Sequence, residues 1–440
     1  GYTLGLLTPF TRADKFYSWI PSVANGSGNW QQESVATIMD PKKGYIARAP
    51  DNYSTNPTVK LPYTAVFTGT PNNGNISAPV YCGAMGSGTQ EDKWNILGTP
   101  YPSAIDALAF LTANTTINGT ISLWTHGSAI SASNPDPFYG DFTYNYSDSD
   151  MLVYNASGSL PAGFSGKIAS GQGFMVSMPD NCNGATTAVN FTNTMRSSTY
   201  VNNNFYKSAN KNGDVEKNRI WFSMIDKNKM ATSAMVGYIE GATNENDRLY
   251  DALADIGPTM KIYSLLDNTA LTIQGRAIPF DVNEKIPLGI KIVAPGTYAI
   301  AIDQLDGLFD MQDIYIEDKL LNIIQDIKVK PYHFVSEVGT FNDRFLIRYN
   351  NENKLNTKNP IAITTVIALI NKDKINIQAS ENIKKVQVFD VAGKLIKTYS
   401  PKNASKTFED EFLFSDGVYF AKIKLENGMT ETRKLANGEY

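Results

Sequence analysis

The stretch that decides the fold class lies near the end of the chain and reads GVYFAKIKL-ENGM-TETRKL (residues 417–435). Apolar and polar residues alternate along residues 417–425, which is the period of a strand with one buried face. Asn427 and Gly428 then form a pair that is typical of a tight turn, and the alternation resumes over residues 430–435. The stretch therefore predicts a β-hairpin.

Short apolar runs bounded by Gly, Pro and Asn recur through the rest of the chain, for example at residues 220–225 and 386–389. They predict an all-β protein with β-sandwich-type domains in series and a small Ig-like seven-stranded sandwich at the end. Helix signals are few. Residues 103–111 are the best candidate, with Ser103 as N-cap, and residues 246–254 are a weaker one.

Composition shifts predict four segments. Residues 1–196, rich in Asn, Ser, Thr and Gly, form a first β domain, and residues 197–349 form a second, sandwich-like one. Residues 350–361 are polar and read as a linker. Residues 362–440 form the terminal sandwich, which the linker allows to fold and dock independently of the rest.

An internal echo predicts a hairpin duplication inside the first domain. Residues 43–50 resemble residues 172–179, and each is followed by a second strand-like segment, at 64–70 and at 187–194. The pair Asn73-Gly74, which follows the segment at 64–70, predicts a hairpin turn.

Composition also excludes several classes of function. The 440 residues include 39 basic and 43 acidic ones, two histidines and two cysteines. A net charge of −4 without a long basic run argues against nucleic-acid binding. The scarce His and Cys argue against zinc and iron–sulfur sites, and no apolar stretch approaches the ~18 residues of a membrane span. We expect no metal, no cofactor and no transmembrane segment. Because the chain begins at Gly1 without a methionine, we expect it to be the carboxy-terminal part of a longer protein.

The two cysteines, Cys82 and Cys182, leave two interpretations open. A disulfide between them would close a loop of about 100 residues and would imply an oxidising compartment. Alternatively, they are two unrelated buried thiols.

The sequence contains few signals of a catalytic site. There is no GxSxG elbow, and neither cysteine has a recognisable catalytic context, so we predict no catalytic residues here. Asp303, Asp306, Asp310 and Asp313 could hold calcium through their oxygens, as could residues 148–150. Because the DxDxDG pattern is missing, we favour solvated loop acids.

Aromatic clusters leave a binding role open. Trp124 and His126 follow a strand, and residues 138–146 contain five aromatic side chains. Such rings beside Asn and Asp could stack sugars, but alternating aromatics more often form the buried face of a strand, which we favour.

The end of the chain resembles the type A sorting domain of cargo proteins of the Bacteroidota type IX secretion system. Three blocks carry the likeness, VQVFDVAGKLI (386–396), FSDGVYFAKIK (414–424), and ENG (426–428) with the strand up to Leu435. Gly393 and Gly417 are expected to need positive φ. The residues that match the motif are Phe389, Asp390, Gly393, Lys394, Asp416, Gly417, Val418, Tyr419, Lys424, Asn427, Gly428 and Lys434.

Residues 1–350 resemble a β-rich region that precedes such domains in large flavobacterial surface proteins. The likeness is carried by residues 96–106, 237–244, 273–277 and 339–345.

The resemblance implies export across the outer membrane. The terminal domain would be recognised by a PorV-like shuttle and by a translocon barrel of the SprA or Sov type, then cleaved, with the protein released or anchored to surface lipopolysaccharide. We therefore expect the carboxy-terminal part of a secreted or cell-surface protein that is adhesin-like and non-catalytic, with surface glycans as candidate ligands. The alternative is a secreted hydrolase or carbohydrate-binding protein with the same sorting domain.

Overall fold

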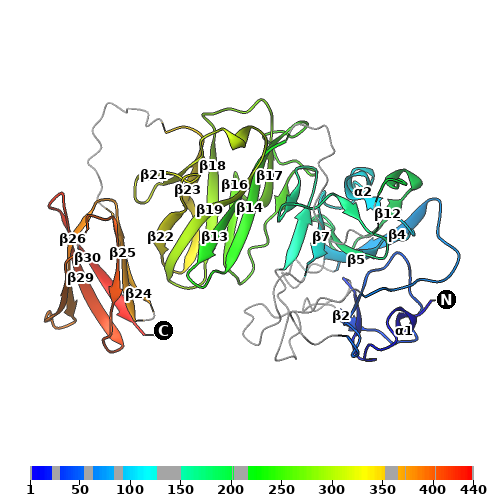
Figure 1. Cartoon of the computed structure of the whole chain (residues 1–440), viewed down its shortest axis with the longest axis horizontal. Coiled ribbons are helices and arrows are strands. Elements are labelled where there is room, and N and C mark those ends of the chain that lie inside the picture. The colour runs from blue at the N-terminus through cyan, green and yellow to red at the C-terminus, as the bar shows by residue number, and fades with distance from the viewer. Residues whose placement is uncertain are drawn as a thin grey trace. The chain divides into compact units, whose positions relative to one another are not determined.

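The computed structural model describes residues 2–21, 30–53, 63–83, 93–125, 150–200, 202, 217–351, 365–371, 373–401 and 403–438. Strands dominate these residues and the helices are short (Figure 1), which confirms the all-β class. In this part of the chain no helix has the length and apolar character that a bilayer-spanning helix needs.

The chain forms two compact units whose boundary differs from the expected one at residue 196. The first unit comprises Gly1–Gly213 together with Asp247–Ala252, and the second comprises Asp214–Asn246 with Leu253–Tyr440. Residues 247–252 belong to the first unit because Arg248 donates hydrogen bonds to the carbonyl oxygens of Leu111 (2.7 Å) and Ile117 (2.8 Å). Gly119 permits this approach, since a Cβ there would lie 1.8 Å from the carbonyl oxygen of Arg248.

The first unit consists of small antiparallel sheets. Its five-stranded sheet has the order β5 (Trp94–Gly98), β11 (Gly173–Ser177), β7 (Ile121–Trp124), β8 (Met151–Tyr154) and β9 (Ser159–Leu160). The remaining elements are the sheet of β2 (Trp30–Gln32), β1 (Phe16–Trp19) and β3 (Tyr45–Ala47), the pairs β4 (Ile76–Tyr81) with β12 (Thr186–Phe191) and β6 (Ile105–Asp106) with β10 (Lys167–Ile168), the helices α1 (Leu4–Leu7) and α2 (Ala107–Ala113), and the 3-10 helix η2 (Asn193–Met195).

Three aromatic rings at the centre of the first unit join its sheets to α2. Phe110 of α2 contacts Phe174 of β11 edge to face, with ring centroids 5.3 Å apart, and Phe191 of β12 at 5.0 Å. All three side chains are buried. Apolar burial of this kind is the main stabilising term of such a unit.

The bridged alternative for the two cysteines is the one that the structure contains. Cys82 and Cys182 form a disulfide with their Cα atoms 5.9 Å apart. Cys82 follows β4 directly, and Cys182 lies in the turn that leads into β12. The bridge therefore closes the end of the β4–β12 pair, where Tyr81 lies opposite Thr186.

Two expectations about helices need correction. The helix predicted at residues 103–111 exists, but it begins at Ala107, because Ile105 and Asp106 pair with β10 as strand β6. The N-cap is therefore Asp106, whose carboxylate accepts a hydrogen bond from the backbone N–H of Ala109 (2.8 Å), and not Ser103. Residues 246–254 form a turn followed by the short strand β15 (Ala252–Leu253), so the second predicted helix is wrong.

The predicted hairpin duplication is also wrong. Strand β3 pairs with β1, whereas β11 pairs with β5 and β7, so the two similar segments occupy different sheets. Residues 64–70 form no strand and are exposed, and Asn73-Gly74 precedes β4 without joining two paired strands.

The second unit contains an eleven-stranded sheet that curves around one core in a nearly closed, barrel-like arrangement, instead of the two facing sheets expected for residues 197–349. Strands β14 and β17 are parallel, and the other neighbours along its main path are antiparallel. The main path is β21 (Ile323–Asp326), β20 (Tyr315–Asp318), β23 (Gly339–Arg348), β18 (Lys285–Ile292), β16 (Lys261–Leu266), β17 (Thr269–Arg276), β14 (Ala231–Ile239), β13 (Lys217–Asp226), β19 (Gly296–Leu305) and β22 (Tyr332–Ser336). The eleventh strand, β15, pairs with β17 off this path, and the 3-10 helix η3 (Gly307–Asp310) follows β19.

The terminal sandwich has the seven strands that the sequence predicts, and it has its own core. One sheet is β24 (Val366–Asn371), β25 (Lys374–Ala379) and β28 (Thr407–Glu411), and the other is β27 (Leu395–Tyr399), β26 (Ile383–Asp390), β29 (Gly417–Leu425) and β30 (Thr430–Asn437). The buried residues of these strands form one cluster that is separate from the core of the large sheet. Most of the predicted linker, from residue 352, lies outside the described residues.

Candidate functional site

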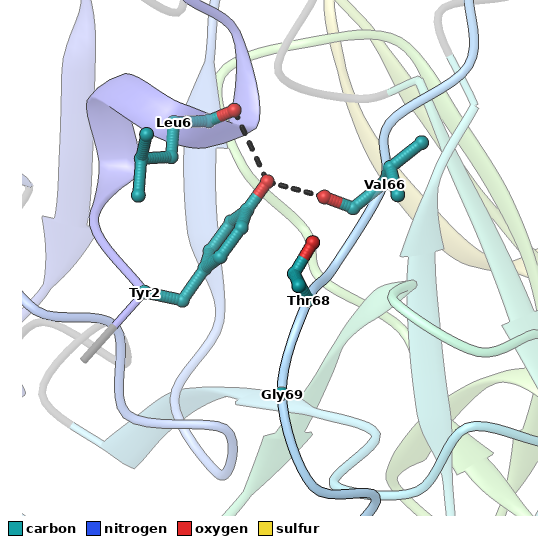
Figure 2. Close-up of a pocket in the computed structure, with 5 residues that line it drawn as sticks. All are labelled: Tyr2, Leu6, Val66, Thr68 and Gly69. Atoms are coloured by element: carbon teal, nitrogen blue, oxygen red, sulfur yellow. Dashed lines mark hydrogen bonds between the residues drawn. The ribbon is translucent and has the colours of Figure 1, made fainter.

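A surface hollow of the first unit lies between α1 and the irregular segment at residues 64–70 (Figure 2). Its volume is about 750 Å³, and its lining residues are Tyr2, Leu6, Val66, Thr68 and Gly69. Two segments about 60 residues apart in the sequence therefore form one concave surface.

The hydroxyl of Tyr2 links these two segments. It donates hydrogen bonds to the carbonyl oxygens of Leu6 (3.1 Å) and Val66, between which it points in Figure 2. Burial, and to a smaller degree the neighbouring Tyr63, raises the pKa of Tyr2, so its hydroxyl stays a donor at physiological pH. Tyr63 makes a similar bond to the carbonyl oxygen of Leu7 (2.9 Å).

Several exposed apolar side chains gather around the hollow. Leu6 is 58% exposed, Val66 64% and Phe67 53%, and the Phe67 ring lies 5.3 Å from that of Tyr2 between centroids. Exposed apolar side chains that gather in this way are typical of binding surfaces. The described lining residues, with the Tyr2 ring and the Leu6 and Val66 side chains, suit contact with a ring or an apolar group.

The residues that carry the resemblance to a sorting motif divide between the two ends of one sheet. Strands β26 and β29 are antiparallel with Asp390 opposite Tyr419, so the 389–394 block and the 416–419 block lie at the same end. The Asn427-Gly428 turn lies at the other end of β29, about 30 Å away for nine residues. Of the third block, only the Asn427-Gly428 turn is separated from the first two blocks, because β30 returns along β29 and places Lys434 opposite Phe420 and Leu435 opposite Tyr419.

The β26–β27 turn is held by the carboxylate of Asp390. One of its oxygens accepts hydrogen bonds from the backbone N–H groups of Ala392 (3.0 Å) and Lys394 (2.9 Å). Gly393 has φ +80° in this turn, and Gly417 has φ +157° at the start of β29. Positive φ is confirmed at both glycines, but the requirement for glycine is stronger at Gly393, because Gly417 is close to extended backbone.

The outward face of the same sheet combines basic and aromatic side chains. Lys422, Lys424 and Lys434 are exposed there, and Lys434 lies opposite Phe420, which in turn lies opposite Phe389. We call these five residues the basic face. Its positive charge contrasts with the net charge of −4 of the chain and favours anionic partners.

Three of the four clustered aspartates serve separate structural contacts, and the fourth, Asp310, is exposed. Asp303 accepts hydrogen bonds from Ser223 and Ser233, and Asp306 forms an ion pair with Arg219. Asp313 accepts from the Tyr315 hydroxyl at 3.3 Å. Within the described residues no group of three or more His, Cys, Asp or Glu side chains could hold a metal ion. The remaining calcium candidate, residues 148–150, lies outside them except for Asp150.

The arrangement nearest to a catalytic one joins Ser223 and Asp303 across β13 and β19, which sequence spacing alone could not reveal. Serine activation uses an imidazole base, and the described histidine, His333, lies opposite Ala299 of β19. Asp303 is four residues further along that strand, about 13 Å away. The buried Ser223 therefore has no such base beside it among the described residues.

The aromatic cluster considered for sugar binding cannot be placed as a unit. Trp124 ends strand β7, whereas His126 and residues 138–146 lie outside the described residues.

Comparison with sequence families matches residues 1–349 to a domain of unknown function, DUF8693. The chain belongs to the DUF8693 family. Residues 355–437 match a second domain of unknown function, DUF8694, which covers all seven strands of the terminal sandwich. The DUF8693 region spans both residues 1–196 and 197–349, and it ends where the predicted polar linker begins. A search of curated proteins found no match.

Proposed function

We propose that this chain is the carboxy-terminal part of a secreted or cell-surface protein, and that its terminal sandwich is the export signal read by the type IX secretion system. The observation that carries the proposal is the meeting of two motif blocks, residues 389–394 and 416–419, at one end of a sheet. Turns and exposed side chains gathered at one end of a separately packed domain offer a partner a continuous surface. The shuttle and the translocon barrel of that system would be the partners.

The disulfide supports passage through an oxidising compartment. Bonds of this kind persist in periplasmic, secreted and surface proteins and are rare in a reducing cytosol. The bridge between Cys82 and Cys182 lies in the region that would be cargo, outside the proposed signal.

We propose that the DUF8693 region binds and does not catalyse. The exposed aromatic and apolar side chains around the hollow of Tyr2 and Val66 support this role. Surface glycans are the proposed ligands, because an exposed ring such as Phe67 beside backbone carbonyl groups offers sugars both stacking and hydrogen bonds.

The purified chain is expected to show no turnover of polysaccharide or peptide substrates, because the described residues around the hollow offer binding contacts and no nucleophile beside a base. Release of reducing sugar or of new amino termini would be measured over several hours. Activity that disappears on substitution of a single carboxylate or histidine would contradict the proposal.

Export should depend on the shape of the β26–β27 turn. Gly393→Val is expected to abolish secretion of the full chain, carried behind an ordinary signal peptide, from a host with a type IX system, because valine at φ +80° strains the turn by about 1–3 kcal/mol. Gly417→Val should have a smaller effect, since its φ is closer to extended backbone. The measurement is the amount of protein in the medium and in the periplasm.

Two further variants separate recognition from folding. Ala392→Val places the same residue in the same turn at a position without positive φ, and it should be secreted like the wild type. Lys434→Glu changes the charge of the exposed basic face without touching the core, and it should reduce secretion. Equal secretion of all variants, and of a chain ending at Asn359, would refute the assignment.

A further inference from the structure

Side chains join β22, the last strand on the path of the barrel-like sheet, to β20 and β23 near the other end of that path. The Tyr332 hydroxyl of β22 donates to Asp318 of β20 (2.9 Å), and Arg344 of β23 donates through Nη1 to the carbonyl oxygen of Val335 (3.0 Å). We call these four residues the seam. β22 ends the hydrogen-bonded path, and its outer edge would otherwise present unpaired backbone groups.

The charges within the seam are fully paired. Arg344 binds both carboxylate oxygens of Asp318, with Nη2 at 2.8 Å, and Oδ1 of Asp318 also accepts from the backbone N–H of Leu320 (3.0 Å). Asp318 is 0% exposed and Arg344 4%. Burial and the nearby carboxylate raise the pKa of Tyr332, so its hydroxyl remains a donor.

The terminal sandwich supplies the last partner of this edge. The Gln378 side chain of β25 accepts from the backbone N–H of Val335 (2.7 Å) and donates to the carbonyl oxygen of His333 (3.1 Å). A neighbouring strand would bind the same two groups, because the N–H and C=O groups of alternate residues point to the same edge. The Gln378 amide therefore binds two backbone groups of β22 that a neighbouring strand would otherwise bind.

The Gln378 side chain can reach β22 because it points away from the core of the terminal sandwich. Ile375, Ile377 and Ala379 of β25 belong to that core, so the intervening Asn376 and Gln378 face outward. Gln378 is nevertheless only 2% exposed.

Neighbouring contacts support the docking of this face. Asn376 accepts a hydrogen bond from the Thr297 hydroxyl of β19 (3.1 Å), and Asn371 donates to the carbonyl oxygen of Pro295. Leu369 of β24 lies outside the sandwich core yet is 6% exposed.

We propose that the seam is a docking surface for the β24–β25 face of the terminal sandwich, which acts as a latch on the barrel-like sheet through Gln378. Undocking would leave the N–H of Val335 and the C=O of His333 without this partner, so seam opening and sandwich release are linked. A partner that pulls on the sandwich loosens the seam, and a loosened seam releases the sandwich. The linkage does not depend on the export proposal.

The test is hydrogen exchange of the full chain, followed by mass spectrometry, for wild type, Gln378→Leu and Gln387→Leu. Gln378→Leu should accelerate exchange in the β22 peptide roughly tenfold, the factor expected for one lost buried hydrogen bond. Gln387→Leu makes the same change on the outward face of β26 and should leave β22 unchanged. Exchange in β29 reports whether the sandwich still folds. If exchange in β29 changes in Gln378→Leu, the comparison is repeated with Gln378→Asn, whose side chain keeps the amide group but is shorter.

A second measurement tests docking directly. Thr297→Cys with Asn376→Cys should react with a short bismaleimide to form an intramolecular crosslink, several-fold more slowly when Gln378→Leu is added. The native cysteines are bridged and do not react. Absence of the crosslink in the parent chain would overturn the docking surface, and equal β22 exchange with and without Gln378 would overturn the latch.

Discussion

Replacing both Cys82 and Cys182 by alanine is expected to lower the free energy of unfolding of the first unit by about 4–5 kcal/mol. The bridge spans a sequence separation of 100 residues, and on the chain-entropy model a loop of that length restricts the unfolded chain by about this amount. Urea unfolding followed by a probe in the first unit would measure the loss as a lower midpoint.

The second unit provides an internal control for this experiment, because the chain has only two cysteines and both lie in the first unit. Its unfolding midpoint should be the same in wild type, in the double variant and under reducing conditions. Alkylation of the unfolded, unreduced protein should label no thiol. Two labelled cysteines, or unchanged unfolding of the first unit in the double variant, would contradict the expected role of the bridge.

Arg344→Met is expected to cost about 3–5 kcal/mol of stability in the second unit. The substitution leaves the carboxylate of Asp318, which is 0% exposed, without its charge partner, and an uncompensated buried charge carries a penalty of this size. It also removes the donor to the carbonyl oxygen of Val335. Denaturant unfolding followed by the fluorescence of Trp221, a buried residue of β13, would measure the loss.

Lys374→Met is the matched control. Lys374 forms an ion pair with Glu409 on the surface of the terminal sandwich, where both side chains are about half exposed. Water screens such a pair, so its loss should leave the unfolding midpoint nearly unchanged. Equal effects of the two substitutions would show that burial of the Asp318–Arg344 pair is not what stabilises the unit.

The last hairpin of the terminal sandwich could be predicted closely because its signals are local. Alternation along residues 417–425 and the Asn427-Gly428 turn depend on neighbours within about ten residues, and the structure places β29 over Gly417–Leu425. The positive φ of Gly393 and Gly417 follows from the same local reasoning.

The first unit was harder to predict because its short strands pair over long separations. Residues 64–70 have the composition of a strand but find no partner, and Ile105 with Asp106 become a strand only because Lys167 and Ile168 lie beside them. β-propensity describes fitness for a half-buried surface, so its outcome depends on tertiary neighbours. The hollow lined by Tyr2 and Val66 likewise depends on contact between segments that are far apart in the sequence.

By itself the sequence determined the all-β class, the seven strands of the terminal sandwich, the glycine turns and the scarcity of His and Cys that limits metal and redox chemistry. These properties follow from composition and from periods of two residues. Only the tertiary structure decided that Cys82 bonds to Cys182, that three of the clustered aspartates serve separate contacts, and that Gln378 closes the edge of β22. Each of these depends on which distant segments meet, and contact between distant segments is set by the packing of whole sheets rather than by local pattern.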